Sequence, residues 1–320
     1  MHDGGPKGSG DSVLLLQGAL ASGRPAITAE VTPPRGGDPA RTLAAARSLK
    51  GWVHAVNVTD GSRAVMRMSS LAMCRLLLDE GLEPVLQMAC RDRNRIALQA
   101  DLLGAHALGL RNVLCLTGDP VGVGDQPSAR PVNELESVRL LKLVSLFNQG
   151  RDPLGGDLPD GATALFAGAA ADPQSPSWSG LRARLRRKQQ AGARFVQTQM
   201  VCDAAALRRF VEELAAPLNL PVLAGVFLLK SARNAAFINR VVPGAQIPQA
   251  LIDRLAQARD PAAEGVAIAA EQVACYAGIA QGVHLMAVKA EERIPRVLAL
   301  AGLGPLSPAV AAPFEADQAD

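Results

Sequence analysis

Eight short apolar runs, each followed by a longer stretch with apolar residues at helical spacing, constrain the fold of this chain more than any other feature. Such an alternation predicts parallel strands joined by crossover helices. The predicted strands are residues 26–32, 53–59, 84–90, 112–117, 164–169, 194–199, 222–227 and 283–288. The predicted helices cover residues 42–49, 69–78, 93–108, 134–148, 180–191, 203–214, 232–241, 261–280 and 292–301.

A glycine recurs between the end of a predicted helix and the start of the next strand. It does so at Gly81, Gly109, Gly192 and Gly282. Glycine suits this position because helices commonly close with a left-handed residue and because the turn into the strand is short. Eight such units without a long linker favour a closed barrel over an open, doubly wound sheet. We therefore predict an α/β fold, a single (β/α)8 TIM barrel.

The two ends of the chain differ in composition from the rest. Residues 1–11 and 307–320 are rich in glycine, proline, alanine and acidic residues, so neither segment should contribute to a core. We expect a disordered N-terminal segment at 1–11, the barrel at 12–306 and a flexible C-terminal tail at 307–320.

The composition argues against several classes of protein. No apolar run approaches the roughly 20 residues of a membrane span, and the N-terminus lacks the apolar stretch of a signal peptide. The formal charge of +3 is small and spread along the chain, which argues against nucleic acid as a partner. The five cysteines are scattered without the spacing of a metal site, so we expect free thiols and no bound metal. These features predict a soluble, cytoplasmic protein that binds neither membrane nor nucleic acid.

Polar residues stand near the carboxyl ends of several predicted strands, where barrel enzymes place their chemistry. Glu30 lies inside an otherwise apolar strand, and burial there disfavours the ionised carboxylate and suits the group to proton donation. An outward, solvated glutamate is the alternative. The fourth strand ends in TGDP at 117–120, which can serve a ligand but is also an ordinary turn sequence. Gln197 and Gln199 are two residues apart in one strand, so we expect them to share a face.

A basic run on one predicted helix has two interpretations. Arg182, Arg184, Arg186, Arg187 and Lys188 would form a solvated face, unless a phosphate-bearing cofactor at the barrel mouth binds them. No loop of the GxGxxG or Walker kind follows a strand, which argues against a Rossmann nicotinamide site and a P-loop. The histidines within elements, His54, His106 and His284, are expected to be core or hydrogen-bonded residues and not ligands. The cysteines that close strands, Cys90 and Cys202, are expected to be small buried apolar residues.

Four segments of the chain form ordered motifs. They are AEVTPPRG at 29–36, VNVTDG at 56–61, CRDRNRIALQADLLGAHALGLRNVLCLTGDP at 90–120 and KQQAGARFVQTQ at 188–199. Together they resemble the methylenetetrahydrofolate reductase family, and the similarity extends from about Pro25 to Leu303. The third segment is highly specific because it is a long, ordered match. The chain is similar to the single-domain prokaryotic branch, which is also found fused to homocysteine methyltransferases.

The resemblance implies FAD at the carboxyl-terminal mouth of the barrel and reduction of 5,10-methylenetetrahydrofolate to 5-methyltetrahydrofolate. NAD(P)H or a redox partner protein would supply the electrons, and a homo-oligomer is compatible with the family. Glu30 and Asp119 would be catalytic, with Glu30 as the general acid, and both would contact the folate together with Gln199. The positions that would bind the flavin are Thr59, Gln87, Thr117, Gly118, Asp119, Ala169, Arg187 and Lys188.

Three positions depart from the family pattern. Gln87 stands where many members have a histidine, Arg233 where an aromatic residue would stack on the aminobenzoate, and Ala290 where an arginine follows an asparagine. Two alternatives to a reductase stay open on the residues alone. Lys230 follows the seventh strand and could form a Schiff base in a lyase or aldolase. The chain could instead be a folate-binding or electron-accepting subunit of a methyl-transfer complex that depends on a partner protein.

Overall fold

The computed structural model of the chain describes residues 15–242 and 244–306. The segments predicted to be disordered or flexible, 1–11 and 307–320, lie outside the described residues. Eight parallel strands close into a barrel in their order along the chain. They are β1 (Ala26–Val31), β2 (Ala55–Val58), β3 (Pro84–Ala89), β4 (Asn112–Leu116), β5 (Phe166–Ala171), β6 (Phe195–Met200), β7 (Val222–Phe227) and β8 (Gly282–Met286). The predicted (β/α)8 TIM barrel is confirmed.

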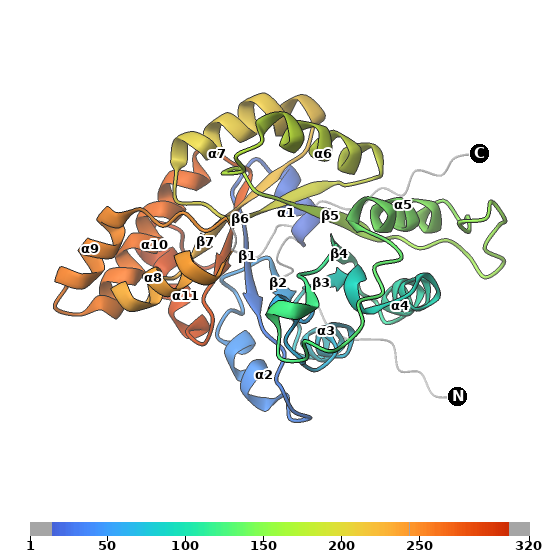
Figure 1. The fold of residues 1–320 in the computed structure, drawn as a ribbon, viewed down its shortest axis with the longest axis horizontal. Helices are drawn as coiled ribbons and strands as arrows, with labels where there is room; N and C mark the ends of the chain where they lie inside the picture. Colours follow the sequence, from blue (N-terminus) through green and yellow to red (C-terminus); the bar gives the residue numbers. More distant parts are fainter. Residues whose placement is uncertain (1–14, 243, 307–320) are drawn as a thin grey trace, which may run out of the picture.

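Helices form a ring around the strands (Figure 1). They are α1 (Leu16–Ala21), α2 (Ala40–Arg47), α3 (Ser70–Asp79), α4 (Arg95–Ala107), α5 (Ser137–Asn148), α6 (Trp178–Gln190), α7 (Ala204–Phe210), α8 (Ala232–Val241), α9 (Gln249–Gln257), α10 (Pro261–Ala277) and α11 (Ile294–Leu300). The sequence did not predict α1 and α9. The helix predicted at 203–214 is α7 followed by a π-helical stretch, Val211–Ala215. Among the described residues, no helix combines the length and apolarity that crossing a membrane requires.

The fifth strand lies two residues further along the chain than the sequence predicted. It runs from Phe166 to Ala171 instead of over 164–169. The backbone of Leu165 forms hydrogen bonds with the side chain of Asn148 and not with a neighbouring strand. Its N–H donates to Asn148 Oδ1 (2.9 Å), and its carbonyl accepts from Asn148 Nδ2 (2.8 Å). Because Asn148 is the last residue of α5, this contact fixes the turn that returns the chain to the barrel.

Three of the four glycines predicted to end helices have the left-handed backbone that this role requires. Their φ angles are +71° at Gly81, +85° at Gly109 and +109° at Gly192. Gly282 differs because it is the first residue of β8. A Cβ atom there would lie 2.2 Å from the carbonyl oxygen of Ala26 in β1, so glycine lets the two strands approach closely. The reason predicted for Gly282 was therefore wrong.

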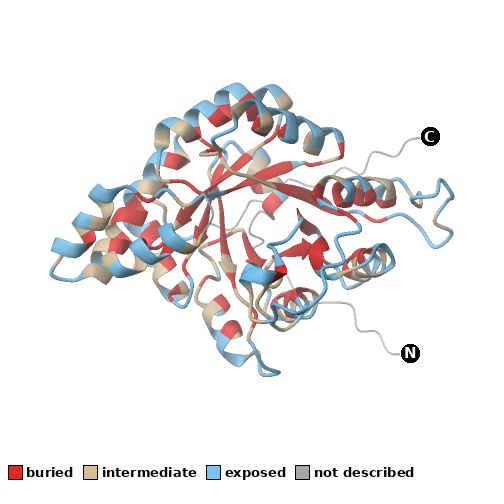
Figure 2. Ribbon diagram, viewed as in Figure 1, coloured by how far each residue is buried: buried red, intermediate tan, exposed pale blue. Residues whose placement is uncertain are grey.

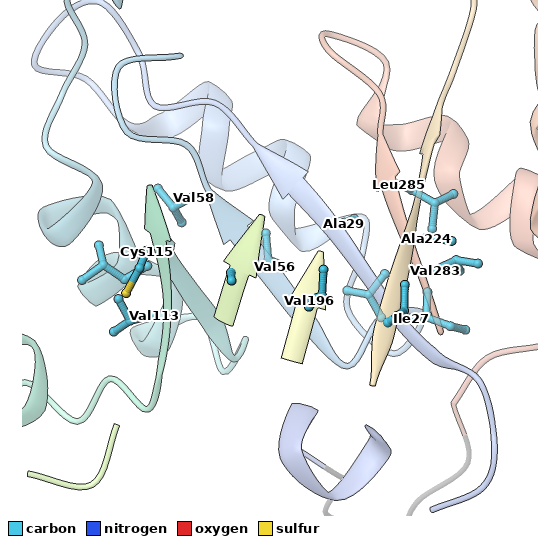
Figure 3. Close-up of a cluster of buried hydrophobic side chains, with 14 of the residues drawn as sticks. Ile27, Ala29, Val56, Val58, Val113, Cys115, Val196, Ala224, Val283 and Leu285 are labelled. Atoms are coloured by element: carbon cyan, nitrogen blue, oxygen red, sulfur yellow. The ribbon is translucent and has the colours of Figure 1, made fainter. Parts of the chain in front are cut away.

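Outward-pointing strand side chains pack against the helices. Figure 3 shows such side chains, among them Ile27, Val56, Val113 and Val283, which belong to four different strands and to one buried cluster. Buried residues occupy the strands and the inner faces of the helices, whereas the outer helix faces are exposed (Figure 2). The main core is thus the layer between strands and helices. The strand residues between these outward-pointing ones face the inside of the barrel.

An apolar plug closes the amino-terminal end of the barrel interior. A second buried cluster includes Phe166, Phe195 and Leu223 near the starts of their strands, and Leu16 of α1 packs against them. The Phe166 and Phe195 rings stack with their centroids 5.2 Å apart. The carboxylate of Glu83 accepts a hydrogen bond from Leu16 N (2.8 Å) and so anchors α1. Further polar side chains face the interior beyond this plug, towards the carboxyl-terminal ends of the strands.

Candidate functional site

The inner face of the barrel is polar beyond the apolar plug. Thr28 of β1 is opposite His284 of β8, and Glu30 of β1 is opposite Asn57 of β2. Residues opposite each other in adjacent strands point to the same side, so these four face the interior. The side chain of Glu30 is 16% exposed, whereas Asn57 and His284 are completely buried. Glu30 is therefore not an outward, solvated glutamate, and a ligand in the mouth would reach it.

His284 lies directly behind Glu30. Its Nε2 atom is 3.5 Å from Glu30 Oε2, and its Nδ1 atom is 3.0 Å from Thr28 Oγ1. His284 packs in the core as predicted, but its proximity to the predicted general acid was missed. The signal that could have found it is the pairing of the first and last strands, which sets His284 opposite Thr28, two residues before Glu30.

Several buried polar atoms inside the barrel have no hydrogen-bond partner within the part of the chain that the structure describes. They are both amide atoms of Asn57, the hydroxyl of Thr59, Oε1 of Gln197 and Nε2 of His284. A buried polar group without a partner costs about 1–3 kcal/mol, so such atoms mark a place that a polar ligand completes. Gln87, another predicted flavin contact, is also buried. It faces inward, because it lies two residues after Val85, which pairs with the inward-facing Asn57.

The turn after β4 forms part of the rim of the mouth. Thr117, Gly118 and Asp119 are exposed. Thr117 Oγ1 accepts a hydrogen bond from Ser137 N (3.2 Å) at the start of α5, and Gly118 has a φ angle of +96°, which favours glycine. The carboxylate of Asp119 accepts a hydrogen bond from Arg63 N (2.6 Å) in the loop after β2. The segment is thus both a structured turn and an acidic part of the rim.

A β-bulge in β6 precedes the exposed Gln199. Gln197 pairs with Leu223 of β7 but Met200 pairs with Gly225, so β6 contains one extra residue. Gly225 accommodates the bulge, because a Cβ atom there would lie 2.4 Å from the carbonyl oxygen of Gln199. The bulge interrupts the alternation from which Gln197 and Gln199 were expected to share a face. Gln197 is buried, whereas Gln199 is exposed and lines a cavity.

This cavity, of about 210 Å³, lies between β5, β6 and α6. Its polar lining comes from Asp172, Arg184, Lys188 and Gln199. The Lys188 ammonium donates to the carbonyl of Ala170 (2.7 Å), and burial lowers the pKa of Lys188 below its usual range. Burial raises the pKa of the Asp172 carboxyl. A half-buried cation with a second cation beside it suits an anionic group, because an anion would offset the cost of removing the charge from water.

The basic helix α6 has two different faces. Arg182, Arg186 and Arg187 are exposed, as the solvated-face interpretation expects. Arg184, which is also exposed, and the half-buried Lys188 lie one helical turn apart and line the cavity. Of the two residues predicted to bind phosphate, Lys188 therefore lies at the cavity, and Arg187 lies on the exposed face.

Four other residues singled out from the sequence lie as follows. The side chain of Ala169 is in the core between strands and helices. The Lys230 ammonium donates to the carbonyl of Val288 (2.8 Å). Arg233 is exposed at the start of α8, and Ala290 is buried after β8.

The two cysteines that close strands are poor nucleophiles. Cys90 is completely buried, and burial raises the pKa of its thiol to about 12. Cys202 is half-buried, and burial raises the pKa of its thiol to about 11. Both would remain protonated at neutral pH, in agreement with their interpretation as packing residues.

The fold and the site define the chain as a (β/α)8-barrel protein whose polar and charged groups gather at the carboxyl ends of its strands. Residues 15–302 match the methylenetetrahydrofolate reductase family, and the chain belongs to that family. The family resemblance inferred from the motifs is confirmed.

Relatives in two eukaryotes carry the same family name. The chain is 27% identical over 192 residues to a probable methylenetetrahydrofolate reductase (NADPH) of Caenorhabditis elegans, a match to 58% of this chain and 26% of that protein. It is 24% identical over 234 residues to methylenetetrahydrofolate reductase 1 of Schizosaccharomyces pombe, which covers 70% of this chain and 36% of the relative. The match thus spans about a quarter to just over a third of these longer proteins.

A solved structure shares the fold. An uncharacterized protein from Clostridium thermocellum superposes with a TM-score of 0.63 at 15% sequence identity. The superposition covers 90% of this chain and 98% of that one, so the whole barrel is common to the two proteins.

Proposed function

We propose that this chain reduces 5,10-methylenetetrahydrofolate to 5-methyltetrahydrofolate with a bound flavin, and that NAD(P)H or a redox partner protein supplies the electrons. The observation that carries the proposal is Glu30, a half-buried carboxyl group at the mouth with the fully buried His284 3.5 Å behind it. Family membership supports the same reaction. The Clostridium thermocellum protein is described as binding two copies of 5-methyl-5,6,7,8-tetrahydrofolic acid, which is the product proposed here.

The residues of the cavity fit FAD. The Lys188 ammonium and the Arg184 guanidinium suit the diphosphate, since charge-assisted hydrogen bonds to phosphate are roughly twice as strong as neutral ones. The carboxylate of Asp172 can accept hydrogen bonds from ribose hydroxyls. The unpartnered hydroxyl of Thr59 and the inward amide of Gln87 can bind polar atoms of the flavin ring. When bound, FAD supplies hydride transfer, and the protein orients it.

Glu30 carries out the proton transfer in this proposal. Reduction of the methylene bridge needs a proton on the nitrogen that departs from the bridging carbon, and a positioned carboxyl group can deliver it. His284 lies 3.5 Å behind the Glu30 carboxyl group without a hydrogen bond to it, and Thr28 fixes the imidazole ring through Nδ1 (3.0 Å). This arrangement leaves the mouth as the open side of the Glu30 carboxyl group.

Asp119 supplies a negative charge at the rim. Its carboxylate is exposed and accepts one hydrogen bond, from Arg63 N (2.6 Å), so it retains further acceptor positions. A carboxylate close to the carbon that receives the hydride stabilises the positive charge that develops there. The amide of Gln199, exposed at the bulge, can donate to and accept from the polar edge of the pterin.

The lyase alternative has weaker support. A Schiff-base lysine must direct an uncharged amine at a substrate carbonyl. The amino group of Lys230 is instead directed at the barrel backbone, through its hydrogen bond to Val288.

The test is Glu30→Gln in the full chain loaded with FAD. We expect flavin binding to be retained and folate reduction to fall by about 10²- to 10⁴-fold, the range of general acid catalysis. Glu83→Gln is the matched control, because Glu83 is a partly buried glutamate that contacts Leu16 and Asn112 at the opposite end of the barrel. It should leave the rate of folate reduction unchanged.

Two outcomes would count against the proposal. Folate reduction at the parental rate by fully loaded Glu30→Gln would remove Glu30 from the chemistry. A wild-type chain that binds the folate but does not reduce it, even when its flavin has been reduced chemically, would favour the alternative of a folate-binding subunit.

A further inference from the structure

Arg91 is a buried arginine in the loop after β3. Only 4% of its surface is exposed. Its Nε and Nη2 atoms donate to the two carboxylate oxygens of Asp92, at 2.7 and 2.6 Å. This bidentate pair neutralises the guanidinium charge. Charged residues are rarely buried unless they are paired, and the other contacts of Arg91 indicate why this one is held inside the rim.

The guanidinium of Arg91 bridges two further loops of the mouth. Nη2 donates to the carbonyl of Gly61 (3.2 Å), in the loop after β2. Nη1 donates to the carbonyl of Asp119 (3.3 Å), in the loop after β4. Arg91 therefore joins the loops that follow three consecutive strands, β2, β3 and β4.

Two glycines make room for this side chain. A Cβ atom on Gly61 would lie 2.8 Å from Arg91 Nη2, and one on Gly118 would lie 2.8 Å from Arg91 Cβ. Both glycines also have positive φ angles, +51° and +96°. The loops on either side are thus built around the space that Arg91 occupies.

We propose that Arg91 is a positioning residue that sets the place of the Asp119 carboxylate at the rim of the mouth. The inference rests on the proposed function, in which that carboxylate acts. Arg91 holds the main-chain carbonyl of Asp119 directly. Through Gly61 it also fixes the loop whose Arg63 N–H binds the carboxylate itself (2.6 Å).

The loop after β2 needs such support. Arg63 and Ala64 have φ angles of +56° and +54°, a backbone conformation that residues with side chains rarely adopt. Conformations of this kind persist where neighbouring groups hold them in place. Without the bridge from Arg91 to Gly61, the N–H of Arg63 would lose its fixed direction, and the carboxylate of Asp119 would lose its fixed donor.

The chemistry of the side chain allows a graded series of variants. The planar guanidinium reaches both carbonyls and the Asp92 carboxylate at once, whereas a lysine ammonium is a point charge that reaches fewer acceptors in fixed directions. Arg91→Met keeps much of the length and removes every donor. Arg91→Lys should therefore have an effect between those of the wild type and Arg91→Met.

The first test is a double-mutant cycle between Arg91→Met and Asp119→Asn, measured as the rate of folate reduction by the FAD-loaded chain. Arg91→Met should slow the reaction by up to about tenfold, the loss expected of Asp119→Asn, because a misplaced carboxylate can lose no more than its own contribution. In the Asp119→Asn background it should change the rate by less than about twofold. If the rate loss of the double variant equalled the product of the losses of the two single variants, Arg91 would not act through Asp119, and the inference would be overturned.

The second test needs no catalysis. Amide hydrogen exchange of residues 59–66 and 117–125 in the full chain with FAD should be at least about tenfold faster in Arg91→Met, and intermediate in Arg91→Lys. Unchanged exchange in both segments would overturn the inference. Failure of the proposed function is a separate result, in which the wild-type chain does not reduce the folate at all.

Arg93→Met is the control for both tests. Arg93 pairs with Asp60 (2.7 Å) and Asp101 (2.8 Å), so its loss also removes a partly buried arginine from the same loop. It should leave exchange in residues 117–125 slow. If Arg93→Met accelerated hydrogen exchange in residues 117–125 as much as Arg91→Met does, the effect would reflect a general loosening of the loops. The specific role of Arg91 would then be refuted.

Discussion

Lys188→Met should weaken FAD binding and leave the protein without FAD at least as stable as the wild type. Lys188 is half-buried at the cavity, and its ammonium donates to the carbonyl of Ala170 (2.7 Å). Hydrogen bonds to charged groups contribute about 1.5–3 kcal/mol. Loss of one such contact with the diphosphate therefore predicts roughly 10- to 150-fold weaker binding.

The stability effect has the opposite sign. Burial, and after it the neighbouring Arg184, lower the pKa of Lys188 in the folded chain below 10.5, so at neutral pH the charged lysine favours unfolding. Methionine removes this cost. It also leaves the Ala170 carbonyl without its donor, and the loss of that hydrogen bond costs about 0.5–1.5 kcal/mol of stability. As pH rises from the lowered folded pKa towards 10.5, the unfolded chain binds more protons, and the wild type gains stability relative to the variant.

The assay is a fluorescence titration of FAD into the apoprotein, together with chemical unfolding of the apoprotein at several pH values. Arg187→Met is the matched control, since Arg187 is an exposed residue of the same helix that does not line the cavity. Equal FAD affinities for Lys188→Met and Arg187→Met would refute the assignment of the cavity to the diphosphate. An apoprotein that Lys188→Met destabilises by several kcal/mol would refute the claim that burial of the charge is costly.

Three further predictions concern the rim, the plug and the thiols. Asp119→Asn should slow folate reduction by about tenfold and leave flavin reduction by the donor intact in stopped-flow traces; equal small losses would leave Asp119 a turn residue. Gly168→Ala should lower stability by about 1–3 kcal/mol, because its Cβ would lie 2.2 Å from the Phe195 ring, whereas Gly122→Ala has open space. At about pH 8, iodoacetamide should label the exposed Cys275 and spare Cys90, whose thiol stays protonated; rapid labelling of Cys90 would contradict its burial.

The sequence predicted the barrel well because apolar periodicity reports directly on which face of each element is buried. It was less accurate where side chains complete the backbone pairing, as at Leu165, whose hydrogen bonds go to Asn148. It also missed α9, an additional helix between α8 and α10 that falls outside the strand-and-helix alternation.

The site was harder to predict because it depends on contacts between distant segments. Motifs identified Glu30, and strand parity turns it inward, but His284 is more than 250 positions away, and only the pairing of β8 with β1 brings the two together. A run of basic residues does not reveal which face of a helix meets a cavity, so Lys188 and Arg187 looked equivalent. The bridge formed by Arg91 depends on the conformations of three loops at once.

The proposed function makes this chain a flavin-dependent reductase of a folate-bound one-carbon unit. The most direct test is the visible spectrum of the purified chain with FAD, recorded without oxygen while reductant and then 5,10-methylenetetrahydrofolate are added. We expect a flavin band at about 450 nm that bleaches with NAD(P)H or dithionite and returns with the folate, as 5-methyltetrahydrofolate forms. A chain that does not retain FAD, or a reduced flavin that the folate does not reoxidise, would contradict the proposed function.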